Sequence, residues 1–161
     1  MSGKQLADEA KRQVFYLAGA IEHAPDGGLG WRARVEAFLE GLPGCEAYNP
    51  ATDETKPLTD EEREHFRDWR TTDFARFQRT MRKIIHWDLE HLASADGVIC
   101  FWDPACRSGG GTPGELTLAR HRGIPVYMVT SLPLTEISCW VLGCCDRVFN
   151  SFGELETFLS K

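Results

Sequence analysis

The sequence lacks any apolar run that approaches the roughly 20 residues of a membrane-spanning helix. Residues 1–12 are polar, have no apolar signal-peptide core and form a candidate disordered segment. Positive charge is also scarce, since 18 Lys and Arg face 24 Asp and Glu and the formal net charge is −6. Binding to phosphate backbones requires a basic surface. We therefore expect a cytoplasmic protein that binds neither membranes nor nucleic acid.

Zinc-binding patterns are absent as well. The six cysteines form no C-x-x-C pair, and no histidine spacing completes a zinc site. Free thiols are the expected state in a reducing compartment. We therefore expect no metal ion and no cofactor.

Linkers, internal repeats and low-complexity segments are missing too. A chain of 161 residues with 42% hydrophobic content fits a single domain spanning residues 1–161, with a substantial core. Residues 50–80 are polar but contain interleaved arginines and aromatics. This region is a candidate lid or subunit contact, because its acids offset the charge that nucleic-acid binding would need.

A glycine-rich stretch, residues 108–123, lies between two apolar runs at 97–102 and 124–129. This arrangement predicts a strand, a tight turn, a helix and a second strand. Three consecutive glycines, Gly109, Gly110 and Gly111, allow the backbone to approach a ligand closely. Thr112 is expected to cap the helix, with Pro113 at its first position and Gly123 at its end.

Glu115 falls in the first turn of that helix, where the helix dipole favours a charged carboxylate. A carboxylate held at the edge of a pocket suits nucleophilic attack on a sugar carbon. A structural interpretation is equally open, because Thr112-x-x-Glu115 is also a capping box. The glycines further match the dinucleotide pattern G-x-G-x-x-G, but the match is weak, being late in the chain and interrupted by Pro113.

Apolar runs alternate with helical patterns along the chain. Strands are expected at 14–18, 45–49, 97–102, 125–129 and 147–150, and helices at 31–42, 61–93 (broken near 70–72), 112–122, within 132–142 and at 152–159. The alternation predicts an α/β fold, a flavodoxin-like doubly wound parallel sheet of order 2-1-3-4-5 with helices on both faces. Ligands bind such sheets where the carboxyl ends of strands one and three meet.

Six short segments follow a distinctive order between about residues 13 and 150. They are 16–21, Trp31-Arg32, Asn49-Pro50, 87–89, Ala95-Asp96 and 111–115. Together they resemble the nucleoside 2-deoxyribosyltransferase family, including related nucleoside and nucleotide N-glycoside hydrolases. The resemblance implies a small-molecule nucleoside or nucleotide substrate. It also implies a homo-oligomer, because family members complete their pocket with a neighbouring subunit.

The resemblance assigns roles to individual residues. Glu115 would attack the anomeric carbon, Tyr16 would position it, and Asp88 would assist the base or the sugar. An acid after the third strand would bind the sugar, and Asp103 is the nearest one, although it lies farther from Glu115 along the chain than in the transferases. The remaining expected substrate contacts are Gly19, Glu22, Trp102, Gly109, Gly110, Gly111, Thr112 and Arg147.

Arg147 stands in the segment that reaches a neighbouring site in the transferases. Its guanidinium fork suits a phosphate, which would favour a nucleoside 5'-monophosphate and hydrolysis over transfer. Arg32 and the basic residues of 76–83 are further phosphate candidates. Arg147 could instead pair with Asp146.

Structural alternatives stand beside the catalytic ones. Tyr16 could be a core aromatic, Asp88 could pair with Arg82 or Lys83, and Asp103 before Pro104 could start a turn. Two other functions also remain open. One is a lysine-decarboxylase-like nucleotide phosphoribohydrolase, whose glycine-rich motif partly resembles residues 109–115. The other is a non-catalytic nucleotide-binding module.

Overall fold

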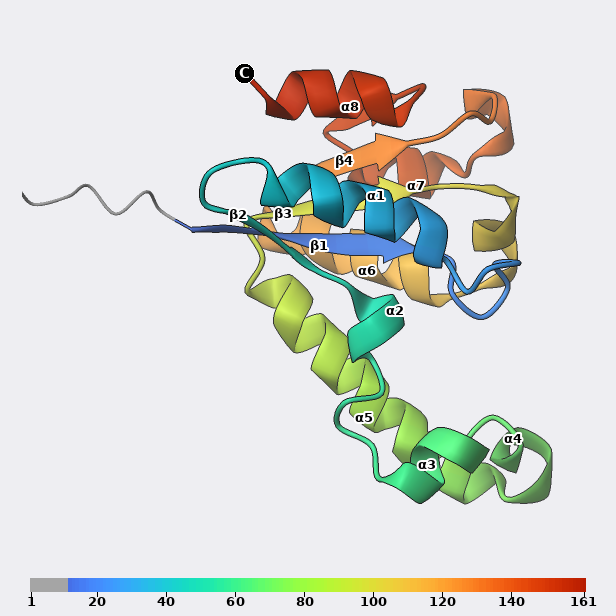
Figure 1. Cartoon of the computed structure of the whole chain (residues 1–161). Helices are drawn as coiled ribbons and strands as arrows, with labels where there is room; N and C mark the ends of the chain where they lie inside the picture. The colour runs from blue at the N-terminus through green and yellow to red at the C-terminus, as the bar shows by residue number, and fades with distance from the viewer. Residues whose placement is uncertain (1–11) are drawn as a thin grey trace, which may run out of the picture.

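Five parallel strands form one sheet in the order β2-β1-β3-β4-β5, as the sequence predicts (Figure 1). The computed structural model describes residues 12–161, so the expectation for residues 1–12 lies almost wholly outside them. The strands are β1 (Gln13–Gly19), β2 (Cys45–Tyr48), β3 (Gly97–Phe101), β4 (Val126–Val129) and β5 (Arg147–Phe149). Within the described residues, no helix is long and apolar enough to cross a membrane.

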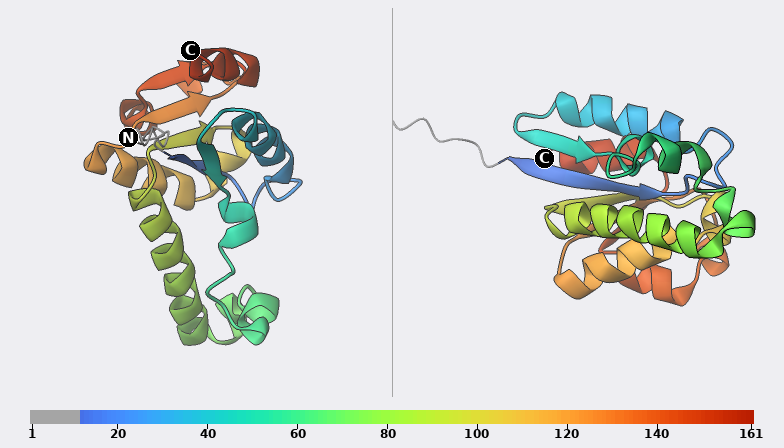
Figure 2. Two further views of the ribbon diagram at one scale, coloured as in Figure 1. Left: turned by 60° about the vertical axis from the view of Figure 1, so that its left-hand side comes forward. Right: turned by 90° about the horizontal axis from the view of Figure 1, so that it is seen from below.

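Helices cover both faces of the sheet, as Figure 2 shows. One face carries α1 (Leu29–Glu40) and α8 (Phe152–Leu159), and the other carries α5 (Phe74–Ala93), α6 (Gly111–Arg122) and α7 (Cys139–Cys144). The short helices are α2 (Pro50–Asp53), α3 (Asp60–His65), α4 (Trp69–Thr72), η1 (Pro104–Ser108) and η2 (Leu134–Glu136). Sequence reasoning missed α2, although Asn49 caps it and Pro50 occupies its first position.

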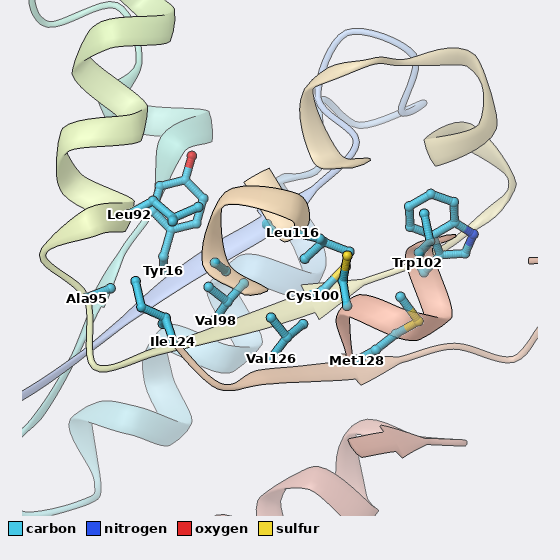
Figure 3. Close-up of a cluster of buried hydrophobic side chains, with 14 of the residues drawn as sticks. Tyr16, Leu92, Ala95, Val98, Cys100, Trp102, Leu116, Ile124, Val126 and Met128 are labelled. Carbon is cyan, nitrogen blue, oxygen red and sulfur yellow. The ribbon is translucent and has the colours of Figure 1, made fainter. Parts of the chain in front are cut away.

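Strand β1, which lies between β2 and β3, is apolar on both faces because helices cover both. Tyr16 and Ala18 point into the cluster beneath α5, α6 and α7, which Figure 3 draws. Phe15 and Leu17 point into the opposite cluster, beneath α1 and α8. The alternation of side chains along a strand therefore places Tyr16 on the face that carries α5 and α6.

Residues 58–77 form a helical arm that projects away from the sheet (Figure 1). Its first helix, α3, begins with the capping box of Thr59 and Glu62. The break expected near residues 70–72 lies at Asp73, between α4, which ends at Thr72, and α5, which starts at Phe74, and a second break separates α3 from α4. A small core of its own holds the arm against α5, made of Leu58, Phe66, Trp69 and Ile84.

The predicted cap of α6 is wrong. The helix begins at Gly111 with Gly110 as its N-cap, and no side chain caps it. Thr112 is buried inside the first turn, where Pro113 is tolerated because the first turn's amides have no partner within the helix. The end of the helix is as predicted, since Gly123 takes the left-handed conformation with φ 72°.

Arg32 is fully buried, which corrects the expectation that it could bind a phosphate. Its guanidinium donates to the carbonyl oxygens of Leu17 (3.2 Å), Gly19 (2.9 Å) and Gly28 (2.9 Å). These bonds tie the end of β1 to the loop that follows it. A side chain at Gly28 would meet the guanidinium at 2.2 Å, so this position requires glycine on steric grounds as well as for its φ of 72°.

Replacing Arg32 with methionine is expected to lower the free energy of unfolding by ~3 kcal/mol or more, because several buried carbonyls lose their donor. Urea denaturation followed by circular dichroism measures the change. Arg34→Met is the matched control on the same helix, since Arg34 is exposed and pairs with Glu156 at 2.8 Å. The free energy of unfolding of Arg34→Met is expected to fall by less than ~1 kcal/mol. Equal losses in the two variants would contradict the structural role of Arg32.

Candidate active site

A cavity of about 480 Å³ opens at the carboxyl ends of β1 and β3. The chain leaves β1 for one side of the sheet and β3 for the other, so this is the topological switch point. Its walls are the loop after β1, the glycine-rich start of α6, one side of α5 and the helical arm. A pocket of this volume is suited to a small-molecule ligand.

Glu115 lines the cavity, and Tyr16 contacts Glu115 from the core behind. The Tyr16 hydroxyl donates a hydrogen bond of 2.6 Å to Glu115 Oε1, although the two residues lie 99 positions apart. The Tyr16 ring is fully buried, so it is a core aromatic, and its hydroxyl reaches the cavity only through Glu115, which lines it. Glu115 is held by Tyr16 and not by the Thr112 amide, which excludes the capping-box interpretation.

Burial governs the protonation of this pair. Desolvation raises the pKa of Glu115 to about 7, although the Tyr16 hydroxyl and the Arg32 guanidinium act in the opposite direction. Desolvation and the neighbouring carboxylates of Glu115 and Asp88 raise the pKa of Tyr16 well above its ordinary value. Tyr16 therefore stays a neutral donor, while Glu115 is divided between its two forms near neutral pH.

Asp88 lines the same cavity from α5. The Tyr48 hydroxyl donates to Asp88 Oδ1 at 3.1 Å, and the Tyr48 ring stacks on Tyr16 with centroids 5.3 Å apart. Desolvation, followed by the charges of Glu115 and Glu54, raises the pKa of Asp88 to about 7. The alternative pairing with Lys83 is not formed, since Lys83 binds Glu62 at 2.6 Å.

Glu54 is a third carboxyl group on the cavity wall, and sequence reasoning missed it. It is the C-cap residue of α2, and desolvation raises its pKa. The nearest cationic group is Arg67, whose Nη2 lies 3.6 Å from Glu54 Oε1. Because Glu54, Asp88 and Glu115 act on one another, their titration belongs to the group and not to single residues. The start of α2 at Asn49-Pro50 was the one sequence signal that could have placed Glu54 here.

The glycines that line the cavity have different surroundings in the glycine-rich start of α6 and at the end of β1. Gly109, Gly110, Gly111 and Thr112 all line it, and a side chain at Gly110 or Gly111 would meet nothing within 4 Å. This open space leaves room for a ligand against the backbone. Gly19 also lines the cavity, but a side chain there would meet the Trp31 ring at 2.8 Å, so its size is fixed by packing.

Glu22 lines the cavity from the loop after β1 and is bound to the helical arm. Arg70 Nη2 donates to Glu22 Oε1 at 2.7 Å, and this bond lowers the pKa of Glu22. Arg67 and Arg70 both line the cavity, and they belong to the region that the sequence marks as a candidate lid or subunit contact. The arm therefore supplies part of the cavity wall, and these two arginines pair with acids outside the arm.

Three expected substrate contacts lie away from the cavity. Trp102 is buried in the core cluster of Figure 3, because the alternation of side chains along the strand directs it to the face that carries α5, α6 and α7. Asp103 accepts from the Cys106 amide at 3.2 Å and caps η1, so it starts a turn. The Arg147 guanidinium lies over the Phe158 ring, 4.6 Å from its centroid, at the exposed edge strand. Asp146 pairs with Arg120 instead of Arg147.

The fold and the cavity together describe a doubly wound α/β protein with desolvated carboxyl groups at its switch point. No group of His, Cys, Asp and Glu within residues 12–161 could hold a metal ion. No protein-family model matches the chain, and no curated protein matches its sequence.

Solved structures share the fold. One is a 2-deoxyribosyltransferase from Bacillus psychrosaccharolyticus, with a TM-score of 0.62 and 20% identity over 89% of this chain and 90% of that one. Another is a conserved protein from Enterococcus faecalis V583, with a TM-score of 0.62 and 18% identity over 91% of this chain and 96% of that one. At these identities the likeness shows the fold, and it agrees with the family resemblance of the sequence.

Proposed function

We propose that this protein cleaves the N-glycosidic bond of a deoxynucleoside, nucleoside or nucleoside 5'-monophosphate through a glycosyl-enzyme on Glu115. The observation that carries the proposal is the 2.6 Å hydrogen bond from Tyr16 to a Glu115 carboxyl group that lines the cavity. Similarity of fold to a 2-deoxyribosyltransferase supports the same chemistry.

In the first step, ionised Glu115 attacks the anomeric carbon while the bond from that carbon to the base nitrogen breaks. The electron pair of that bond leaves with the base. Neutral Asp88 donates its proton to the base, and Tyr16 holds the attacking carboxylate in line. A carboxylate stabilises the positive charge that develops on the sugar.

In the second step, water or a second base attacks the same carbon and releases Glu115. The proton of the attacking water or base passes to the Asp88 carboxylate, which restores both carboxyl groups. Two inversions give net retention at the sugar. Water yields hydrolysis and a second base yields transfer, so the acceptor alone separates these two activities.

The test is to incubate the protein with deoxynucleosides, nucleosides and their 5'-monophosphates, each with and without a second free base. Chromatography follows base release and exchange, and intact-protein mass spectrometry after an acid quench detects the glycosyl-enzyme. We expect released base and a mass increase equal to the bound sugar. Binding of these ligands without any release would instead assign the chain to the non-catalytic nucleotide-binding modules.

A further inference from the structure

The cavity extends well beyond its carboxyl groups as an apolar track. Ile85, Ile84, Met81 and Phe77 of α5 all line it, spaced so that they follow one side of the helix from Asp88 toward its N-terminus, and Leu89 lines it beside Asp88. Phe66 of the helical arm lines the cavity too and packs with Ile84, Phe77 and Met81. The site therefore has a group of carboxyls near Glu115 and, along α5, an apolar wall with paired arginines beside it.

The length of the track exceeds what a base needs. Asp88 and Phe77 are 11 positions apart on α5, which corresponds to about 16 Å along the helix axis, or about three turns. A heterocycle placed at Asp88 covers roughly one of these turns. The remaining turns present Ile85, which is 49% exposed, and the partly exposed Met81 and Phe77. Apolar surface left open within a concave site is typical of a ligand-binding wall.

The charged groups at the rim do not offer a free cation to an anionic ligand. Arg70 is bound to Glu22 at 2.7 Å, and Arg67 lies 3.6 Å from Glu54. Their guanidinium groups lie over aromatic rings, Arg67 over Phe66 at 4.5 Å and Arg70 over Phe77 at 5.9 Å. The compensated charges and flat stacked surfaces favour an apolar or aromatic group at this end of the cavity.

We infer that the leaving group of the preferred substrate is a base with an apolar substituent, such as an alkyl or aryl group on the exocyclic amine of a purine. This inference rests on the proposed function, which places the sugar at Glu115 and the base at Asp88. The substituent then follows the track formed by Ile85, Met81 and Phe77. Burying such a group favours the substituted substrate because each methylene that leaves water contributes to binding.

The experiment compares kcat/KM for 2'-deoxyadenosine and N6-benzyl-2'-deoxyadenosine, and for their 5'-monophosphates, by chromatography of the released base. We expect the benzyl substrate to be preferred by at least ~10-fold in the better of the two series. Ile85→Gln is expected to lower this ratio at least ~3-fold, because a polar amide replaces apolar surface on the track. Leu134→Gln is the matched control, since Leu134 is 53% exposed and lies off the cavity.

The possible results distinguish failure of the apolar-substituent inference from failure of the proposed function. Equal efficiencies for the plain and benzyl substrates overturn the inference and leave the proposed function standing. No release from any substrate overturns both. A ratio unchanged in Ile85→Gln, together with a shift from dimer to monomer in light scattering, shows that a second copy covers the track and also overturns the inference.

Discussion

Replacement of Glu115 by glutamine is expected to lower kcat/KM by at least ~10⁴-fold, because the amide carries no charge and cannot attack the sugar. Glutamine keeps the shape of the side chain, and its amide oxygen can still accept the bond that Tyr16 donates at 2.6 Å. The variant should therefore fold normally. Base release measured over long incubations, with circular dichroism on the same samples, tests both statements.

The stability of this variant provides an internal check. Folding raises the pKa of Glu115 to about 7, so the native state binds its proton more tightly than the unfolded chain. The contribution of protonated Glu115 to the free energy of unfolding is complete below about pH 4 and is lost as the pH rises through 7. At pH 8 the free energy of unfolding of Glu115→Gln should exceed that of the wild type by on the order of 1–3 kcal/mol. Near-normal turnover in this folded variant would disprove the nucleophile assignment.

Replacement of Asp88 by asparagine is expected to lower kcat/KM by about 10²–10³-fold, since the leaving base loses its proton donor. The wild-type profile should be bell-shaped around pH 7. Activity falls below this pH as Glu115 gains a proton and above it as Asp88 loses one. The two apparent pKa values belong to the coupled pair. The Asp88→Asn variant should lose the decline at high pH and keep the decline at low pH.

A comparison of leaving groups sharpens this result. For a nucleoside whose base departs readily without a proton, Asp88→Asn should lower kcat/KM much less than it does for deoxyadenosine. Glu90→Gln is the control, because Glu90 lies two positions away on α5, is exposed and is absent from the cavity wall. If both flanks of the pH profile survive in Asp88→Asn, another group supplies the proton.

The sheet could be predicted from sequence because its three inner strands, β1, β3 and β4, are apolar runs between turn signals. β1 is buried on both faces, and the runs alternate with helical patterns, which restricts the order to a few topologies. The family resemblance named Tyr16 as the partner of Glu115, and the two side chains are hydrogen-bonded in the structure. Local chemistry alone could not decide whether Glu115 caps its helix or faces a tyrosine 99 residues away.

Predictions that depended on the direction of one side chain were less secure. Trp102 and Asp103 follow β3 directly, but the pleat sends Trp102 into the core and a local amide binds Asp103. Arg32 and the arm arginines were unpredictable for a different reason. Their roles come from carbonyls and acids far along the chain, such as Gly19 for Arg32 and Glu22 for Arg70. No spacing rule within a helix encodes such partners.

The two edge strands have a consequence for how separate molecules meet. An open sheet presents unpaired amides and carbonyls along each edge, and another chain can extend it there. Here β2 has four residues and β5 has only three, and the β5 edge begins with the charged, exposed Arg147. A short edge that carries a charge offers few bonds to an incoming strand. Arg147 does not line the cavity of its own chain, and its charge at the β5 edge disfavours pairing of this strand with a strand of another molecule.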